Sequence, residues 1–133
     1  MIIGLDDTDS VNGMCTTYIG TLIVESIKDM DRTLIKEPPR LIRLNPNNPY
    51  KTRGNGAVSI RIAEKTDSNL IDKIKTISYD IVKNYSESGD NTNPAIIFLD
   101  EASITKEVEI FSERALHELL SIDEAISLLE CIG

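Results

Sequence analysis

The sequence has no tryptophan, and aromatic residues make up only 5% of it. Hydrophobic residues still fill 41% of its 133 positions, so the core of one domain must consist mainly of Ile, Leu and Val. No apolar run approaches the ~20 residues that a membrane-spanning helix needs, and no signal sequence opens the chain. We therefore expect a soluble, cytoplasmic protein.

Residues that bind zinc or serve as catalytic bases are scarce. The two cysteines, Cys15 and Cys131, lie far apart and form no C-x-x-C pair, so the sequence indicates no zinc site. In a cytoplasmic protein we expect no disulfide between them. The one histidine, His117, falls on a predicted amphipathic helix, and we interpret it as a structural or surface residue.

Charge is distributed unevenly along the chain. The net charge is −8, and an acidic body repels nucleic acid unless positive charge is concentrated locally. Residues 38–63 contain no Asp or Glu, and their basic residues are Arg40, Arg43, Lys51, Arg53 and Arg61. This stretch is the candidate for binding anions. The alternative interpretation is a solvated basic loop that offsets acidic helices.

Hydrophobic periodicity predicts eight elements in the order β-α-β-β-α-β-α-α. Strands are predicted at 2–5, 40–45, 57–63 and 95–99, and helices at 15–30, 68–82, 108–119 and 121–129. Asp67 or Ser68 is expected to cap the second helix, and the capping box of Ser121 and Glu124 to open the last one.

The first six elements match the split βαβ pattern of ferredoxin-like domains. In that fold we expect the loop after the first strand and the loop of the central hairpin to lie at opposite ends of the sheet. Both loops carry candidate site residues, so a shared ligand would require another topology. We therefore predict a single α/β domain with a mixed β-sheet and flanking helices.

Three aspartates, Asp6, Asp7 and Asp9, follow the first strand directly. Carboxylates at the end of a strand and before a helix face the usual ligand crevice of α/β sheets. A divalent cation relieves the repulsion among them, and oxygen ligands suit Mg²⁺ or Mn²⁺, which in turn hold phosphates. The alternative is a turn with a helix-capping aspartate.

The first helix is predicted to begin within residues 13–17, which read Gly-Met-Cys-Thr-Thr. Free backbone N–H groups at a helix N-terminus favour an anion. The hydroxyls of Thr16 and Thr17 can donate to a phosphate, or one of them can accept a phosphoryl group. Ordinary N-capping is the alternative. Cys15 should have a lowered pKa there, but no partner base is visible, so we propose no cysteine nucleophile.

An eleven-residue connection, 46–56, joins the second and third predicted strands. Lys51 and Arg53 supply positive charge, while Gly54 and Gly56 allow the backbone to approach a phosphate closely. Connections of this length are often functional. The loop matches neither the Walker A nor the Rossmann pattern, and an exposed basic hairpin is the alternative.

Taken together, three blocks resemble the archaeal 2-agmatinylcytidine synthetases of isoleucine tRNA. They are Gly4-Leu5-Asp6-Asp7-Thr8-Asp9-Ser10, then Gly13-Met14-Cys15-Thr16-Thr17-Tyr18, then Arg43-Leu44-Asn45-Pro46-Asn47 with Pro49-Tyr50-Lys51-Thr52-Arg53-Gly54-Asn55. The blocks occur in the family's order over roughly the first sixty residues. Weaker similarity continues into residues 112–125.

The resemblance implies an ATP-dependent ligase that activates the wobble cytidine and attaches agmatine to it. The family's N-terminal domain is kinase-like, binds ATP and Mg²⁺, and is phosphorylated on the threonine after the cysteine, here Thr16. The implied catalytic residues are Thr16, Asp7 and Asp9, and the implied metal ligands are Asp6, Asp7 and Asp9. The implied ligands of ATP and its phosphates are Thr17, Arg43, Asn45, Lys51, Arg53, Gly54 and Asn55.

The family continues past this length with a glycine-rich segment, a ferredoxin-like domain, an OB-fold and a zinc ribbon that hold tRNA and agmatine. We therefore expect residues 1–133 to form one ATP- and Mg²⁺-binding domain at the start of a longer enzyme. Alone, it should have little affinity for nucleic acid and should not complete the modification.

Three other functions fit parts of the same sequence. A stand-alone, non-catalytic nucleotide-binding module would keep the phosphate ligands without phosphorylation of Thr16. A Mg²⁺-dependent phosphatase would use Asp6 or Asp7 as nucleophile, but no acid–base partner is evident. A pure RNA-binding module conflicts with the net charge of −8 and with the lack of interleaved aromatic residues in the basic loop.

Overall fold

The computed structural model describes residues 1–52, 54–64, 66–87, 89 and 92–132. Its four strands are β1 (Ile2–Asp6), β2 (Arg40–Arg43), β3 (Gly56–Arg61) and β4 (Ala95–Leu99). They form one sheet in the order β2-β3-β1-β4, and all three pairings are antiparallel. The prediction of a single α/β domain is confirmed. The prediction of a mixed sheet is wrong.

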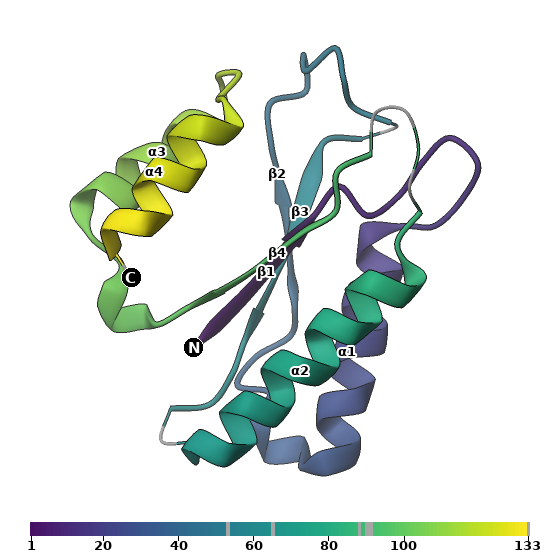
Figure 1. Cartoon of the computed structure of the whole chain (residues 1–133), viewed down its shortest axis with the longest axis vertical. Coiled ribbons are helices and arrows are strands. Elements are labelled where there is room, and N and C mark those ends of the chain that lie inside the picture. Colours follow the sequence, from purple (N-terminus) through teal and green to yellow (C-terminus); the bar gives the residue numbers. More distant parts are fainter. Residues whose placement is uncertain (53, 65, 88, 90–91, 133) are drawn as a thin grey trace.

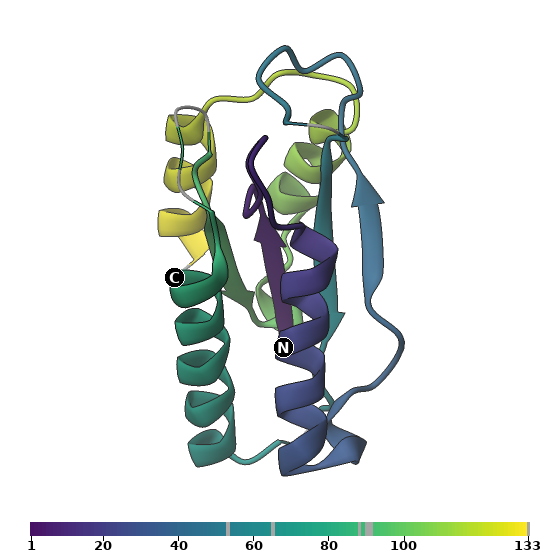
Figure 2. The same cartoon turned by 90° about the vertical axis from the view of Figure 1, so that its right-hand side faces the viewer.

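The sheet order also corrects the expected positions of the two loops. β1 and β2 are both antiparallel to β3, which lies between them, so β1 and β2 run in the same direction. The loops that follow these two strands therefore leave the sheet at the same end, as Figures 1 and 2 show. The split βαβ order needs no change of topology to bring them to one ligand.

Helices lie on both sides of the sheet. One face carries α1 (Thr16–Met30) and α2 (Ser68–Tyr85), and the other carries the hairpin of α3 (Lys106–Ala115) and α4 (Ile122–Ile132) (Figures 1 and 2). The order of strands and α-helices is the predicted one. Two short 3-10 helices, η1 (Arg32–Leu34) and η2 (Glu101–Ser103), were not predicted. None of the described helices is long and apolar enough to cross a membrane.

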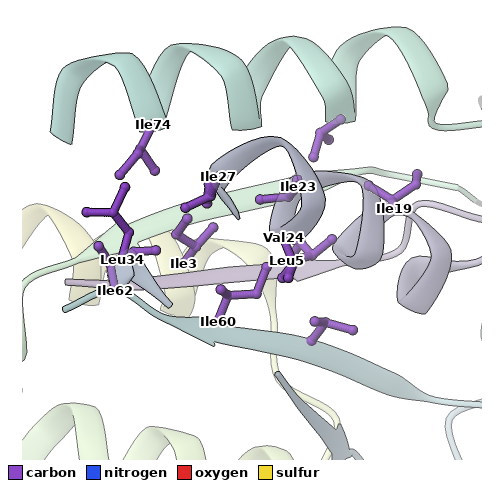
Figure 3. Close-up of a cluster of buried hydrophobic side chains, with 12 residues drawn as sticks. Ile3, Leu5, Ile19, Ile23, Val24, Ile27, Leu34, Ile60, Ile62 and Ile74 are labelled. Atoms are coloured by element: carbon purple, nitrogen blue, oxygen red, sulfur yellow. The ribbon is translucent and has the colours of Figure 1, made fainter. Parts of the chain in front are cut away.

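The core lies between the sheet and the pair α1 and α2 (Figure 3). Alternate residues of β1 and β3 point into it, and the helices contribute residues spaced by one turn. Isoleucine dominates, as the composition predicts: the fully buried large apolar side chains are Ile3, Ile19, Ile23, Ile27, Ile60, Ile62 and Ile74. This core fixes the end of β1 from which the acidic loop departs.

Helix α1 approaches β3 closely because Gly20 has no side chain. A Cβ atom at Gly20 would lie 2.9 Å from Cγ1 of Val58, which is closer than carbon atoms pack. Position 20 therefore sets the distance between α1 and the sheet. The N-terminal turn of α1 is held near the carboxyl end of β1 as a result.

The predicted caps are present. The side chain of Asp67 accepts a hydrogen bond of 2.9 Å from the backbone N–H of Asn69 at the start of α2. Ser121 and Glu124 form the capping box of α4, since each side chain accepts from the other's backbone N–H, at 3.2 and 3.0 Å. Cys15 and Cys131 are both free thiols, as expected.

Two contacts connect the segment of η2 and α3 to the rest of the domain. At one end, the guanidinium of Arg61 lies between Glu37, at 3.4 Å, and Glu101 of η2, at 3.2 Å. At the other end, the backbone N–H of Asn45 donates to the carbonyl of Ala115 over 3.1 Å. The second contact connects the end of α3 to the loop between β2 and β3.

Candidate functional site

Three loops meet at the carboxyl ends of β1 and β2 and enclose one small pocket. They are the acidic loop (residues 7–15), the loop between β2 and β3, and the loop between α2 and β4. The pocket is lined by Asp6, Asp7, Asp9, Thr16, Asn48, Tyr50, Lys51, Thr52, Gly54, Asn55, Gly56 and Asn93. Carboxylates, hydroxyls, amides and one lysine thus face a common space.

Asp7 gives the acidic loop its shape. Its φ is 52°, in the left-handed region that few non-glycine residues adopt. Its backbone N–H donates to the carboxylate of Asp6 over 2.7 Å, and its own carboxylate accepts from the backbone N–H of Asn93 over 2.6 Å. These two hydrogen bonds and the left-handed backbone define the conformation of the loop at Asp7.

The electrostatics of the pocket favour a bound cation. Burial raises the pKa of Asp6 above its ordinary value, and the charges of Asp7 and Asp9 raise it further, although the hydrogen bond from the Asp7 N–H opposes them. Negative charge is therefore crowded at the end of β1. A divalent cation would relieve this crowding.

The expected cluster of three metal ligands is not formed. Among the described residues, no group of three or more His, Cys, Asp or Glu side chains is placed to hold a metal ion. The carboxylate of Asp7 instead accepts a hydrogen bond from the backbone N–H of Asn93. Mg²⁺ does not require three carboxylates, since it is usually held by one or two of them together with substrate phosphates.

Thr16 lies at the start of α1 and lines the pocket, although only 6% of its surface is exposed. Its hydroxyl accepts a hydrogen bond of 3.1 Å from the hydroxyl of Thr8, which is fully buried. The proton of the Thr16 hydroxyl therefore remains available to another acceptor.

Thr17 is turned away from the pocket. It is exposed, and its hydroxyl lies 3.0 Å from the sulfur of Cys15. This hydrogen bond is the main cause of the lowered pKa of the Cys15 thiol. The predicted role of Thr17 as a phosphate ligand receives no support from its position.

The loop between β2 and β3 brings three of the predicted phosphate ligands, Lys51, Gly54 and Asn55, to the lining of the pocket. The ammonium group of Lys51 donates to the carbonyl of Pro46. The side-chain amide of Asn55 donates to the carbonyl of Asn45 over 2.9 Å. Arg53, the other predicted cation, lies outside the described residues.

Two further predicted ligands lie elsewhere. Asn45 is buried inside the loop, where its side chain accepts from the backbone N–H of Asn47 over 2.9 Å, so its position is structural. Arg43 is exposed and lines a separate, mainly apolar hollow together with Leu116 and His117. Lys51, Gly54 and Asn55 line both hollows.

Sequence reasoning missed Asn48, Tyr50, Thr52, Gly56 and Asn93 as pocket residues. The first four belong to the predicted basic loop, and their polarity was a usable signal. Asn93 follows a polar linker far along the chain, and nothing in its neighbourhood marks it. Only the hydrogen bond to Asp7 assigns it to the pocket.

The backbone carbonyl of Asp9 fastens the three loops together. It accepts hydrogen bonds from two hydroxyls, that of Thr52 at 3.4 Å and that of Thr92 at 3.1 Å. These donors come from the two loops on either side of the acidic loop. Near them, the backbone N–H of Glu87 donates to the carbonyl of Thr8 over 3.1 Å. The position of Asp9 is therefore determined by the whole loop assembly.

The family model described as the TiaS TCKD domain matches residues 2–133. The chain belongs to this family. The TiaS protein of Thermococcus sibiricus, a tRNA(Ile2) 2-agmatinylcytidine synthetase, is 46% identical over 129 residues, covering 96% of this chain and 29% of the relative. That of Methanocaldococcus jannaschii is 41% identical over 137 residues, covering 100% of this chain and 32% of the relative. The resemblance seen in the sequence is confirmed.

Solved TiaS structures share the fold. The crystal structure of the TiaS–tRNA(Ile2)–ATP complex matches with a TM-score of 0.83 at 38% identity, over 98% of this chain and 30% of that one. The TiaS–tRNA(Ile2)–AMPCPP–agmatine complex matches with a TM-score of 0.79 at 34% identity, over 98% and 30% of the two chains. The present chain thus spans about a third of the length of its TiaS relatives.

Proposed function

We propose that this chain binds ATP with Mg²⁺ in the pocket at the ends of β1 and β2 and transfers the γ-phosphoryl group to Thr16. The single observation that carries the proposal is that Asp6, Asp7, Thr16 and Lys51 line one pocket. These residues come from three separate sequence blocks. Membership in the TiaS TCKD family, whose solved members include complexes with ATP and AMPCPP, supports the same ligand.

The pocket offers the contacts that phosphoryl transfer needs. Catalysis of this reaction depends on positioning and on neutralising the charge of the transferred group. Lys51 supplies positive charge, and Gly54 and Gly56 let the backbone come close to a phosphate. Among the described residues, the proposed phosphate ligands are Lys51, Gly54 and Asn55, together with Asn48 and Thr52, which line the same pocket.

Magnesium fits the acidic side of the pocket. Burial raises the pKa of Asp6, and its neighbours Asp7 and Asp9 add negative charge, so a divalent cation would lower the free energy of the ionised loop. Bound Mg²⁺ would supply charge neutralisation for the phosphates. The proposed ligands are drawn from Asp6, Asp7 and Asp9, which all line the pocket. A carboxylate that accepts one hydrogen bond keeps further acceptor sites for a cation.

In the proposed step, Oγ of Thr16 attacks the γ-phosphorus, and the bond from that phosphorus to the β,γ-bridging oxygen breaks. ADP leaves with the electron pair of that bond. The hydroxyl proton of Thr16 passes to a carboxylate of the acidic loop, for which Asp7 and Asp9 are the candidates. The hydrogen bond from Thr8 occupies a lone pair of the Thr16 oxygen and leaves this proton free to be transferred.

In the longer protein, we propose that this domain supplies the ATP-dependent activation of the wobble cytidine of isoleucine tRNA for attachment of agmatine. The TiaS relatives are named as tRNA(Ile2) 2-agmatinylcytidine synthetases, and one solved complex contains tRNA(Ile2) and agmatine. The net charge of −8 is consistent with tRNA being held mainly by other parts of such an enzyme.

The test uses ATP labelled at the γ-phosphate, Mg²⁺, the wild-type chain, and the variants Thr16→Ala and Thr17→Ala. We expect label on the wild type and on Thr17→Ala, and none on Thr16→Ala. Thr17 is the matched control because it is the adjacent threonine but lies outside the pocket. Label that persists in Thr16→Ala would refute the assignment.

One observation favours a second function. Thr16 is largely buried, as a threonine that only supports the loop would be. A non-catalytic nucleotide-binding module would bind ATP, measured by calorimetry, and would show no label on any variant.

A further inference from the structure

Asn45 is the residue at which the end of α3 meets the loop between β2 and β3. Its backbone N–H donates to the carbonyl of Ala115, the last residue of α3, over 3.1 Å. The last four carbonyls of a helix have no partner inside that helix, so this bond satisfies one of them from outside. The two segments lie at the same end of the molecule (Figures 1 and 2).

The other hydrogen bonds of Asn45 lead to the phosphate pocket, which is the proposed ATP site at the ends of β1 and β2. Its carbonyl accepts from the side-chain amide of Asn55 over 2.9 Å and from the backbone N–H of Asn48 over 3.3 Å. Its side chain accepts from the backbone N–H of Asn47 over 2.9 Å, which braces the turn. Asn48 and Asn55 both line the pocket. One residue thus contacts the end of α3 and two walls of the pocket.

The connection continues to the residues that follow in the loop. The side chain of Asn48 accepts from the backbone N–H of Tyr50 over 2.9 Å. The ammonium group of Lys51 donates to the carbonyl of Pro46, the residue directly after Asn45. Tyr50 and Lys51 also line the pocket. A displacement of Asn45 would therefore change the position of the segment that carries the proposed phosphate-binding lysine.

Asn45 is held firmly enough to follow the helix. Only 7% of its surface is exposed. If its backbone N–H separated from the carbonyl of Ala115, a buried donor would lose its partner, and leaving such a group unsatisfied costs more free energy than one hydrogen bond normally contributes. A small shift of the end of α3 should therefore carry Asn45 with it.

The position of the Ala115 carbonyl depends in turn on the neighbouring Arg114. The guanidinium of Arg114 forms ion pairs with Glu118 at 2.8 Å and with Glu124 at 3.2 Å, and so connects the end of α3 to the start of α4. Arg114 is not among the residues that line the phosphate pocket. The geometry of the hairpin at Ala115 is thus set by contacts that lie outside the ATP site.

We propose that Asn45 is a positioning residue that couples the α3–α4 hairpin to the phosphate pocket. When the end of α3 shifts, Asn45 shifts with it and displaces Asn48 and Asn55, so the hairpin controls the affinity for ATP through residues outside the pocket. This inference rests on the proposed ATP-binding function and adds a means by which that site is regulated.

The test compares variants at the two ends of α3. Arg114→Ala removes both ion pairs beside Ala115. Lys106→Ala is the matched control, because it removes an ion pair with Glu109, at 3.1 Å, in the first turn of the same helix. Asn45→Ala deletes the side-chain acceptor, and Asn45→Ser retains an oxygen that can accept. Circular dichroism and thermal unfolding verify that each variant is folded.

Two quantities are measured: the affinity for ATP in the presence of Mg²⁺, and the hydrogen-exchange rates of the Asn48 and Tyr50 amides in the ligand-free chain. We expect Arg114→Ala to weaken ATP binding and to accelerate exchange, each about 2- to 10-fold, the range that corresponds to one or two exposed ion pairs. Asn45→Ala should act in the same direction, and Asn45→Ser should recover. Lys106→Ala should match the wild type in both quantities.

A double-mutant cycle tests the route. Asn55→Ala removes the side-chain bond between Asn55 and the carbonyl of Asn45. If the hairpin acts through this bond, Arg114→Ala should weaken ATP binding less in the Asn55→Ala background than in the wild type. Strictly additive effects would overturn the route through Asn45.

The proposal is also overturned if Arg114→Ala binds ATP like the wild type, or if Lys106→Ala loses as much affinity, since both ends of α3 would then act only by general loosening. A wild-type chain that binds no ATP refutes the proposed function instead. The ligand-free exchange rates then decide on the coupling alone: faster exchange at Asn48 and Tyr50 in Arg114→Ala supports it, and unchanged exchange overturns it.

Discussion

The hydroxyl of Thr8 donates a hydrogen bond of 3.1 Å to the hydroxyl of Thr16, and both side chains are buried. Thr8 belongs to the acidic loop and Thr16 to the first turn of α1, so this hydrogen bond connects the loop directly to the helix. It fixes the orientation of the hydroxyl that we propose as the phosphoryl acceptor.

Replacing Thr8 by valine should slow phosphorylation of Thr16 about 2- to 10-fold, the range that corresponds to one neutral hydrogen bond. The ATP concentration that gives half the maximal rate should stay the same, because Thr8 does not line the pocket. Thr8→Ser, which keeps the hydroxyl, should restore the rate. Equal losses in the serine and valine variants would show that only packing at this position matters.

Asp6 should make the stability of the ligand-free chain depend on pH. Burial raises its folded pKa above the ordinary value of 3.8, so the folded chain holds the proton more tightly than the unfolded chain. Ionised Asp6 therefore lowers the free energy of unfolding as the pH rises through the folded pKa, and this loss of stability persists at neutral pH. Asp6→Asn should unfold at a higher temperature than wild type at neutral pH, and the difference should shrink in acid.

Thermal unfolding across the acidic range, without Mg²⁺, measures this difference. Asp9→Asn is a suitable comparison, because it removes one carboxylate charge from the same pocket. An Asp6→Asn variant less stable than wild type at neutral pH would mean that the hydrogen bond from the Asp7 N–H outweighs the burial of the charge.

Gly20→Ala should destabilise the fold by about 1–2 kcal/mol, since overpacking costs more than the ~1 kcal/mol that alanine adds to helix stability. The new Cβ would lie 2.9 Å from Cγ1 of Val58. Chemical denaturation measures the effect. In a Val58→Ala background the clash is removed, so the same change at position 20 should be neutral or stabilising.

Thr92→Val should weaken binding of Mg²⁺ and ATP without removing any group from the phosphate pocket. It deletes the 3.1 Å hydrogen bond to the carbonyl of Asp9 and so loosens the acidic loop. We expect an affinity loss of about 2- to 10-fold, with recovery in Thr92→Ser. Hydrogen exchange of the acidic-loop amides should be faster in the valine variant, and unchanged exchange would argue against this bracing role.

The elements could be predicted from the sequence because each has a clear periodicity and clear end signals. The alternation of Val58, Ile60 and Ile62 marked β3, and the capping box of Ser121 marked the start of α4. The loops that follow β1 and β2 were predicted to lie at opposite ends of the sheet, but both leave it at the same end. That position depends on strand direction, which no local pattern records.

The site could be predicted only as far as its residues cluster in sequence. The acidic loop and Lys51 were found because charge and glycine are concentrated there. Asn93 and Thr92 were missed because their partners, Asp7 and Asp9, lie more than eighty residues away, at separations of 86 and 83. The burial of Asn45 could not be foreseen, because a buried loop amide and a phosphate ligand look alike in a sequence.

The left-handed backbone at Asp7 has a consequence for how this position tolerates change. Glycine would adopt a φ of 52° at lower cost, since such strain in other residues is worth about 1–3 kcal/mol. A glycine there would relax the turn and also delete the carboxylate that meets Asn93. Asp7→Gly would thus relieve backbone strain and at the same time remove a charge from the pocket. Selection for thermal stability alone should therefore favour this substitution and yield an inactive chain.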